Sequence, residues 1–268
     1  MRTNNNFSEN ETILLRKDSG PIATLTLNRP DKFNALSTNL MDQLKVELNK
    51  LAEDKLIRVV IIAANGKAFC AGHDLLEMQK DASPEAIGKL FNQCSEVMLS
   101  LTRLPQPIIA KVQGVATAAG CQLVAQCDLA IASDNVQFAT SGIKIGLFCG
   151  TPMVAVTRNL PRKQAMEMLL TGEFINAETA VHYGLINKSV PLEKLDDSVQ
   201  ELAENIASQG PAFITAGKKL FYQQIEGEIS RAYEKASKIM VENMQREDAR
   251  AGIKAFLEKS DMPDWQER

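Results

Sequence analysis

The sequence has no apolar run approaching the ~18 residues that span a bilayer, and aromatic residues make up only 5% of its 268 positions. It also lacks an excess of one charge, since 30 Lys and Arg face 33 Asp and Glu and both signs are scattered along the chain. A nucleic-acid backbone or an anionic lipid surface needs a strong basic field. We therefore expect a soluble globular protein that binds neither nucleic acid nor a membrane.

Histidine is nearly absent and cysteine is not arranged in pairs. Two histidines cannot build a His-rich metal site or a chain of proton relays. The five cysteines form an odd set without a CxxC pair, which is typical of reduced, buried thiols in a reducing compartment. Residues 1–10 lack both a signal-peptide core and an Arg-rich transit pattern. These features predict a short disordered start, no metal site and a cytoplasmic protein.

The length suits one large domain or one domain with a helical appendage, on a prior of ~150 residues per domain. A hairpin is predicted over residues 12–27, a helix over 38–53 with Ser37 as its N-cap, and a doubly covered strand over 58–63. Further helices and strands then alternate at 85–101, 107–112, from about 119, and at 128–132. This alternation predicts a largely parallel α/β core.

After about residue 161 the chain changes to Lys- and Glu-rich helical segments. They are predicted at 163–170, 177–183, 192–206, 212–223, 228–245 and 248–258. We therefore expect an α/β core over residues 1–200 and a helical region over 201–268, with a boundary good to about 10 residues.

Two segments, at residues 67–75 and 114–122, place small residues where a helix is expected to start after a buried strand. Amide groups at a helix N-terminus point outward, and small residues let a ligand atom approach the backbone closely. Two such ends facing one another would form an oxyanion hole. Clusters of Ala and Gly at such turns also serve close packing alone, so both interpretations stand at this point.

Five further segments, taken together, make the chain resemble the crotonase family, also called the enoyl-CoA hydratase/isomerase family. They are LNRPDKFNALS at 27–37, KAFCAGHDL at 67–75, PIIAKVQGVATAAGCQLVAQCDLAIAS at 107–133, KIGLFCGTP at 144–152 and TGE at 171–173. The resemblance runs almost end to end. It implies the crotonase fold, an α/β spiral of parallel-strand layers with a helical C-terminal region for oligomerisation.

The resemblance also implies an acyl-CoA site. Family members hold the thioester carbonyl between two backbone amides, and the matching positions are His73 and Ala119. Positions implied to contact the substrate or its coenzyme A portion are Arg29, Lys32, Asn34, Ala35, Leu36, Ala71, Gly72, Asp74, Leu75, Gly120 and Cys149. Arg29 and Lys32 are candidates for phosphate contacts, and Lys259 is a weaker one.

The chain departs from the hydratase pattern at both general acid/base positions. Family hydratases use two glutamates there, whereas this sequence has Gln122 and Gly142. An amide neither accepts nor donates a proton usefully at neutral pH, and a carboxylate of this kind contributes ~10²–10⁴-fold to the rate. We therefore expect hydration of an enoyl thioester to be severely impaired, with Gln122 left to orient a water molecule.

Several side chains are compatible with both a catalytic and a structural role. The imidazole of His73 could act as an acid or base, although its backbone role is favoured, and Asp74 is favoured as a helix cap over a metal ligand. Cys149 could be a nucleophile but is favoured as a small buried hydrophobe. Ser141 could replace the missing glutamate, although no histidine is evident to activate it. His182 is favoured as a structural or surface residue.

Three functional hypotheses remain open from the sequence. The first is a hydratase-like lyase of fatty-acid metabolism with a displaced acid/base group. The second is another enolate reaction, such as decarboxylation of a malonyl-type CoA ester. The third is a non-catalytic acyl-CoA-binding protein. In each case coenzyme A enters as part of the substrate and no resident cofactor is expected, and the resemblance implies a homotrimer or a dimer of trimers.

Overall fold

The computed structural model describes residues 12–266. The expected disordered start at residues 1–10 lies outside this range. Six strands form the main sheet in the order β1-β2-β3-β5-β7-β10. The strands are β1 (Leu14–Ser19), β2 (Ile22–Leu27), β3 (Val59–Ala64), β5 (Ile108–Val112), β7 (Leu129–Ser133) and β10 (Lys188–Val190). Only β1 is antiparallel to its neighbour, so the predicted hairpin and parallel α/β core are confirmed.

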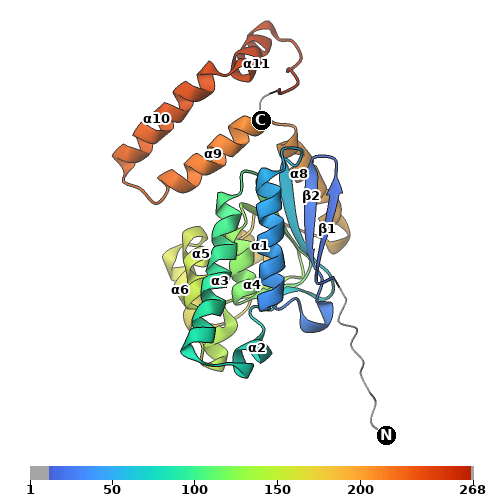
Figure 1. Cartoon of the computed structure of the whole chain (residues 1–268), viewed down its shortest axis with the longest axis vertical. Helices are drawn as coiled ribbons and strands as arrows, with labels where there is room; N and C mark the ends of the chain where they lie inside the picture. Colours follow the sequence, from blue (N-terminus) through green and yellow to red (C-terminus); the bar gives the residue numbers. More distant parts are fainter. Residues whose placement is uncertain (1–11, 267–268) are drawn as a thin grey trace.

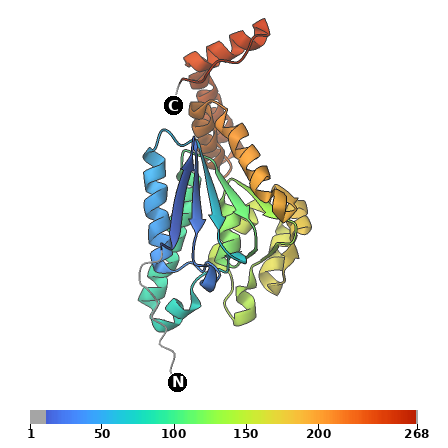
Figure 2. The same ribbon diagram turned by 90° about the vertical axis from the view of Figure 1, so that its right-hand side faces the viewer.

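Helices cover both faces of this sheet (Figure 2). On one face, α1 (Thr38–Glu53) and α3 (Pro84–Arg103) present the apolar stripes read from the sequence. On the other face, α8 (Leu195–Ala207) packs four buried side chains against the strands. Because both faces are covered, β3 is buried at all six positions, which explains its unbroken apolar sequence.

A second, smaller sheet carries the parts of the chain that matter for chemistry. Its order is β4-β6-β8-β9, from β4 (Ala68–Cys70), β6 (Val115–Thr117), β8 (Gln137–Ala139) and β9 (Ile175–Asn176). The first three strands are parallel, so their carboxyl ends meet at one edge. The sequence did not predict these strands, because segments of two or three residues have no readable periodicity.

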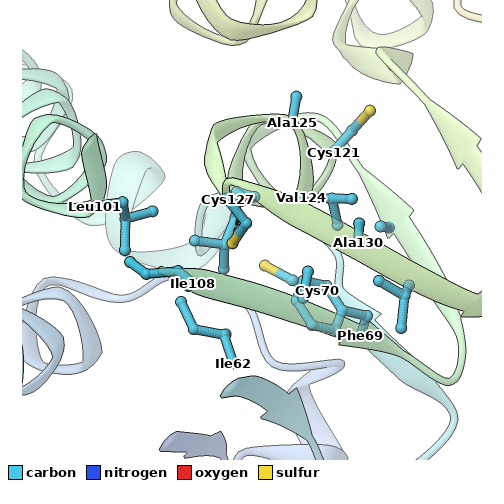
Figure 3. Close-up of a cluster of buried hydrophobic side chains, with 14 of the residues drawn as sticks. Ile62, Phe69, Cys70, Leu101, Ile108, Cys121, Val124, Ala125, Cys127 and Ala130 are labelled. Atoms are coloured by element: carbon cyan, nitrogen blue, oxygen red, sulfur yellow. Dashed lines mark hydrogen bonds between the residues drawn. The ribbon is translucent and has the colours of Figure 1, made fainter. Parts of the chain in front are cut away.

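The core between the sheets and α4 (Ala119–Gln126) contains several of the cysteines (Figure 3). Cys70 and Cys127 lie among Ile108 and Val124, while Cys121 points away from them. Burial raises the pKa of Cys70 and of Cys121 to about 12, so these thiols stay protonated. All five cysteines are free and buried, which confirms the prediction of buried thiols.

The last three helices extend away from this body as an arm (Figure 1). They are α9 (Pro211–Gln224), α10 (Ile229–Gln245) and α11 (Glu247–Glu258). The boundary expected at residue 200 falls within α8, whose buried face belongs to the main sheet. The remaining helices are α2 (Leu75–Lys80), α5 (Gly150–Asn159), α6 (Arg162–Thr171) and α7 (Ala177–Tyr183), and the short 3-10 turns are η1 (Pro30–Lys32), η2 (Ser141–Ile145) and η3 (Leu192–Lys194). Among residues 12–266, no helix has the length and apolar character needed to cross a membrane.

Candidate functional site

A mostly apolar cavity of about 410 Å³ opens where the second sheet ends. Its walls come from the loop after β4, the start of α4, one side chain of α3, and the segment from η2 to α5. The lining residues are Ala71, His73, Leu75, Met78, Phe91, Ala118, Ala119, Ser141, Gly142, Ile145, Leu147, Phe148, Cys149, Gly150, Thr151 and Pro152. None of these lining residues of the described chain is Asp, Glu, Lys or Arg. The cavity suits an apolar ligand, and it offers no carboxylate for proton transfer.

One backbone donor at this cavity is the amide of His73, between β4 and α2. Here the chain forms a parallel bridge with Leu36, whose N–H donates to Gly72 O at 2.7 Å and whose carbonyl accepts from Asp74 N at 3.3 Å. In such a bridge the residue between the two bonds turns its own N–H to the opposite side. The His73 N–H therefore points away from Leu36, and it has no backbone acceptor within residues 12–266.

The second backbone donor is the amide of Ala119, the first residue of α4. A helix leaves its first N–H groups without an intrahelical acceptor, and Ala118 at the N-cap position has no side-chain oxygen to satisfy them. Ala118 adopts a φ of 51°, uncommon outside glycine, while its own N–H donates to Ala139 O at 2.9 Å. The N–H of Ala119 has no backbone acceptor within residues 12–266, and the residue lines the cavity.

Two glycines bring these two backbone segments into contact. A Cβ on Gly72 would lie 3.0 Å from Ala118 Cβ and 3.3 Å from Ala119 N. A Cβ on Gly120 would lie 2.0 Å from Cys70 O, closer than any side chain allows. The loop after β4 and the start of α4 can therefore touch only because both positions are glycine. This contact brings the backbone of residue 72 against residues 118 and 119, and His73 and Ala119 both line the cavity.

The imidazole of His73 is neutral and has no hydrogen-bond partner in residues 12–266. Both ring nitrogens are buried and unpaired, and the ring packs edge-on against Phe91 with centroids 5.3 Å apart. Burial lowers the pKa of His73, against the opposing effects of the Leu36 carbonyl and Glu77. No hydrogen bond joins the ring to Ser141, so the described residues do not form a Ser–His catalytic pair.

Gln122 and Gly142 have different surroundings at the two positions where hydratases carry glutamate. Gln122 is 3% exposed on α4, its side-chain oxygen is buried without a partner, and it is not among the residues that line the cavity. Gly142 lines the cavity, but a Cβ there would lie 2.3 Å from Leu147 O and 2.9 Å from Cys149 Sγ. The backbone of residue 147 thus occupies the space that a glutamate at position 142 would need.

Ser141 and Cys149 are the remaining candidates for side-chain chemistry in the cavity. The hydroxyl of Ser141 is hydrogen-bonded to Thr117 Oγ1 at 2.6 Å, a partner that cannot act as a base. Burial raises the pKa of Cys149, which is 5% exposed, so the thiol is a poor nucleophile. Nothing in the sequence indicated that Thr117 belongs to the site, because only the pairing of β6 with β8 brings it next to Ser141.

Most residues implied to contact coenzyme A form the strap over residues 29–36 and the loop after β4. Asn34 is fully buried and donates to Asn65 O and Ala68 O, both at 2.8 Å, so its side chain is used within the fold. Arg29 donates to Ala35 O at 2.6 Å and pairs with Asp74 at 3.0 Å. Asp74 also caps α2, in agreement with its favoured reading. Lys32 is exposed, which leaves its ammonium group accessible to a ligand.

Neither a metal cluster nor a histidine relay is evident in the described chain. Among residues 12–266, no three His, Cys, Asp or Glu side chains are grouped so as to hold an ion. His182 is exposed on α7, as favoured from the sequence, and it is not among the residues that line the cavity.

Comparison with known proteins supports the family resemblance over nearly the whole chain. A family model described as enoyl-CoA hydratase/isomerase matches residues 17–268. Enoyl-CoA hydratase domain-containing protein 3, mitochondrial, from Rattus norvegicus is 44% identical over 252 residues, covering 94% of this chain and 84% of that protein. The Homo sapiens protein of that name is 42% identical over 238 residues, covering 89% of this chain and 78% of the relative.

Solved structures give the same result for the fold. A structure titled enoyl-CoA hydratase from Mycobacterium smegmatis is 50% identical with a TM-score of 0.94, covering 95% of this chain and 99% of that one. The structure of human enoyl-CoA hydratase domain-containing protein 3 has a TM-score of 0.91 at 40% identity, and the match covers 94% of this chain and 100% of that one. The predicted crotonase fold is confirmed, as is the likeness to domain-containing protein 3 carried by ATAAGCQLVA, GLFCGTP and AFLEKSDMPDW.

The predicted cytoplasmic localisation is wrong by the same comparison. The relatives from Rattus norvegicus, Mus musculus and Homo sapiens are all named as mitochondrial proteins. These names point to mitochondria. The prediction depended on the composition of a short segment and on reduced cysteines, and reduced thiols by themselves do not distinguish one reducing compartment from another.

Proposed function

Because the chain belongs to the enoyl-CoA hydratase/isomerase family, we propose that it binds acyl-CoA thioesters and holds the thioester carbonyl between the backbone amides of His73 and Ala119. The observation that carries this proposal is that two residues with free backbone N–H groups, His73 and Ala119, line one mostly apolar cavity. The acyl chain occupies the cavity, and the coenzyme A portion lies along residues 29–36 and 71–75. The substrate enters as the thioester, and no other cofactor is required.

In this mechanism the backbone stabilises charge on the thioester oxygen. Two preorganised N–H groups polarise the carbonyl and stabilise the enolate that forms when a bond at the α-carbon breaks. The N-terminal end of α4 adds its positive dipole to the same oxygen. Removing one such donor in other enzymes lowers the rate by ~10²–10³-fold, which sets the scale expected here.

Hydration by a pair of glutamates is not the reaction that this cavity favours. Gln122 is buried behind the lining, and Gly142 faces the backbone oxygen of Leu147 at a distance that excludes a larger residue. A lyase of the hydratase type would need another acid/base group, and Ser141 and Cys149 are protonated groups without a base beside them. The proposed activity is therefore binding and enolate stabilisation, and the expected role of Gln122 in orienting water is not part of it, because Gln122 does not line the cavity.

The second candidate function is decarboxylation of a malonyl-type CoA ester. The absence of any carboxylate among the lining residues favours it, because loss of CO₂ generates the enolate without a general base. A cavity wall without a carboxylate also exerts no repulsion on the substrate's own carboxylate. Non-catalytic binding of acyl-CoA is the third possibility, and turnover assays separate all three.

We also propose a homo-oligomer, a trimer or a dimer of trimers, built by the C-terminal arm. Helix α10 has no buried residue, although its apolar side chains include Tyr233 at 71% and Val241 at 62% exposure. Exposed apolar stripes of this kind mark surfaces that another chain covers. Light scattering on the purified protein, with Val241→Glu compared against Lys238→Glu, tests the proposal. A monomeric wild-type protein would contradict it.

The test of the carbonyl site uses a variant that deletes one N–H and keeps the helix. Proline is tolerated at the first position of a helix, so Ala119→Pro removes the donor, while Ala119→Gly keeps it. Infrared spectra of bound [1-¹³C]butyryl-CoA should show the carbonyl band shifted to lower frequency in the wild type and in Ala119→Gly. The shift should be lost in Ala119→Pro at matched circular dichroism.

Each result of these measurements has a defined meaning. Binding without a carbonyl shift would refute the oxyanion hole, and failure of butyryl-CoA to bind would refute the acyl-CoA site. Turnover is then measured with crotonyl-CoA and methylmalonyl-CoA. Hydration above the background rate would show that an acid/base group has been overlooked, CO₂ release would establish the decarboxylase, and binding without turnover would leave the non-catalytic role.

A further inference from the structure

The Thr117–Ser141 hydroxyl pair is a polar feature at the cavity that the proposed function does not use. Thr117 ends β6 and Ser141 begins η2, 24 positions later in the chain. Their oxygens are 2.6 Å apart, at the short end of the range for such bonds, and both residues are half-buried. Ser141 also lines the cavity.

The backbone around both residues is held in place on each side. Thr117 is registered with Ala139 in the parallel ladder of β6 and β8, and Ala118 N donates to Ala139 O at 2.9 Å. The buried hydroxyl of Thr140 donates to Met168 O at 2.7 Å, which ties the segment to α6. The two hydroxyl groups are thus preorganised by the sheet.

The hydroxyl pair has one hydrogen that is available to a ligand. Each hydroxyl has one hydrogen and two lone pairs, and the bond between them uses one hydrogen. No other hydrogen-bond partner of either oxygen is present within residues 12–266. When Thr117 donates, the hydrogen of Ser141 is free to point into the cavity, and accepting a bond strengthens Ser141 as a donor.

Ser141 lines the same cavity as the two residues of the proposed oxyanion site, His73 and Ala119. Thr117, its hydrogen-bond partner, is two residues before Ala119, so the Cα atoms of Thr117 and Ala119 are at most about 7.6 Å apart. An acyl group without a polar substituent would leave the remaining hydrogen of the hydroxyl pair without an acceptor in a mostly apolar cavity, which lowers affinity.

We infer that Ser141 is a specificity-determining residue that selects acyl groups bearing a hydroxyl or oxo oxygen near the thioester, and that Thr117 is its positioning residue. Ser141 donates a hydrogen bond to the ligand oxygen, and Thr117 donates to Ser141. This inference rests on the proposed acyl-CoA site and adds the substituent that the acyl group carries.

The test compares thioesters of equal chain length. Calorimetry measures the affinity of the wild-type protein for butyryl-CoA, 3-hydroxybutyryl-CoA and acetoacetyl-CoA. The net value of one neutral hydrogen bond predicts that the two oxygenated ligands bind about 3- to 10-fold more tightly than butyryl-CoA. Ser141→Ala should reduce this ratio to about one.

Variants of Thr117 separate positioning from a structural role. Thr117→Val keeps the shape but cannot donate, so it should lower the ratio. Thr117→Ser restores the donor and should restore the ratio. Thr151→Val is the matched control, since Thr151 lines the cavity without bonding to Ser141. Its ratio should equal that of the wild type, and melting curves establish that each variant is folded.

Three results would overturn the inference. Equal affinity of the wild type for all three thioesters, or an unchanged ratio in Ser141→Ala, would show that the hydroxyl selects nothing, while leaving the acyl-CoA site intact. Failure of all three thioesters to bind would refute the proposed acyl-CoA site and this inference with it.

Discussion

A buried ion pair contributes to the attachment of the C-terminal arm to the core, and breaking it should have a large effect. Lys218 on α9 is 7% exposed, and its ammonium donates to Leu101 O and Gln106 O, both at 2.9 Å, and to Asp128 Oδ2 at 2.6 Å. Asp128 also accepts from Ile108 N at 2.7 Å and from Tyr222 Oη at 2.8 Å. All three ammonium hydrogens therefore have acceptors.

The size of the effect follows from what Lys218→Met would leave behind. The methionine fills the space of the lysine stem, but the Asp128 carboxylate loses its positively charged partner, and the carbonyls of Leu101 and Gln106 lose the lysine as donor. Removing one partner of a buried pair costs about 3–5 kcal/mol, because the remaining charge is uncompensated. In the double variant Lys218→Met/Asp128→Asn the charge is gone, so the total loss should be smaller than the sum of the single losses by about 2 kcal/mol.

The single tryptophan provides the assay. Trp265 packs against Phe213 at the start of α9, with ring centroids 6.3 Å apart, and donates to Ser208 O at 3.0 Å. Its fluorescence reports the packing of the C-terminal segment against Phe213 and Ser208, at the junction of the arm and the core, while circular dichroism reports the whole fold. Urea unfolding is followed by both signals at one protein concentration, because the stability of an oligomer depends on concentration.

The wild-type free energy of unfolding should exceed that of Lys218→Met by about 3–5 kcal/mol. In the variant, the fluorescence transition should precede the circular dichroism transition as the arm detaches first. A loss below about 1 kcal/mol, or single losses that add in the double variant, would refute the reasoning. Either result would show that the pair behaves like a solvent-exposed salt bridge.

Three further predictions follow from the site. Gly120→Ala should destabilise the fold by about 3 kcal/mol or more, because the added Cβ would lie 2.0 Å from Cys70 O. The control Gly217→Ala, on α9 with open space around it, should not destabilise the fold, and equal melting temperatures of the two variants would contradict this prediction. Burial lowers the pKa of His73 from 6.5, so the unfolded chain takes up a proton more readily. The folded state should be fully favoured above pH 6.5 and lose stability as pH falls toward the folded pKa. His73→Phe should flatten the melting temperature between pH 5 and 7.5, and an unchanged profile would show that another group is responsible. Because burial raises the pKa of Cys149, iodoacetamide should label it slowly at pH 7.5, and saturating butyryl-CoA should slow it further; rapid labelling would revive the thiol nucleophile.

Long elements were predictable because each carries its own periodic signal. The helix expected over residues 38–53 has those bounds in the structure, and the side chain of Ser37 accepts from Leu40 N as an N-cap should. The arm helices were placed to within one or two residues at each end. These segments repeat one local rule over many residues, so packing elsewhere in the fold has little effect on their pattern.

The geometry of the candidate site depended on contacts between distant segments. Free N–H groups at residues 73 and 119 were implied by family resemblance, but their contact depends on Gly72 meeting Ala118 and on Gly120 meeting Cys70. The blocked space beside Gly142 results from the path of the backbone at Leu147, and the partner of Ser141 comes from a strand of three residues. None of these relations has a period that a sequence displays.

The sequence by itself thus determined the composition class, the alternation of helices and strands, and the loss of both glutamates. The tertiary structure alone decided that position 142 has no room for a carboxylate, that Gln122 is buried behind the cavity lining, and that Thr117 pairs with Ser141. The physical reason is the range of the interactions involved. Hydrophobic periodicity and capping act within a few residues, whereas close backbone approach and side-chain pairing depend on how three strands from different parts of the chain meet at one edge.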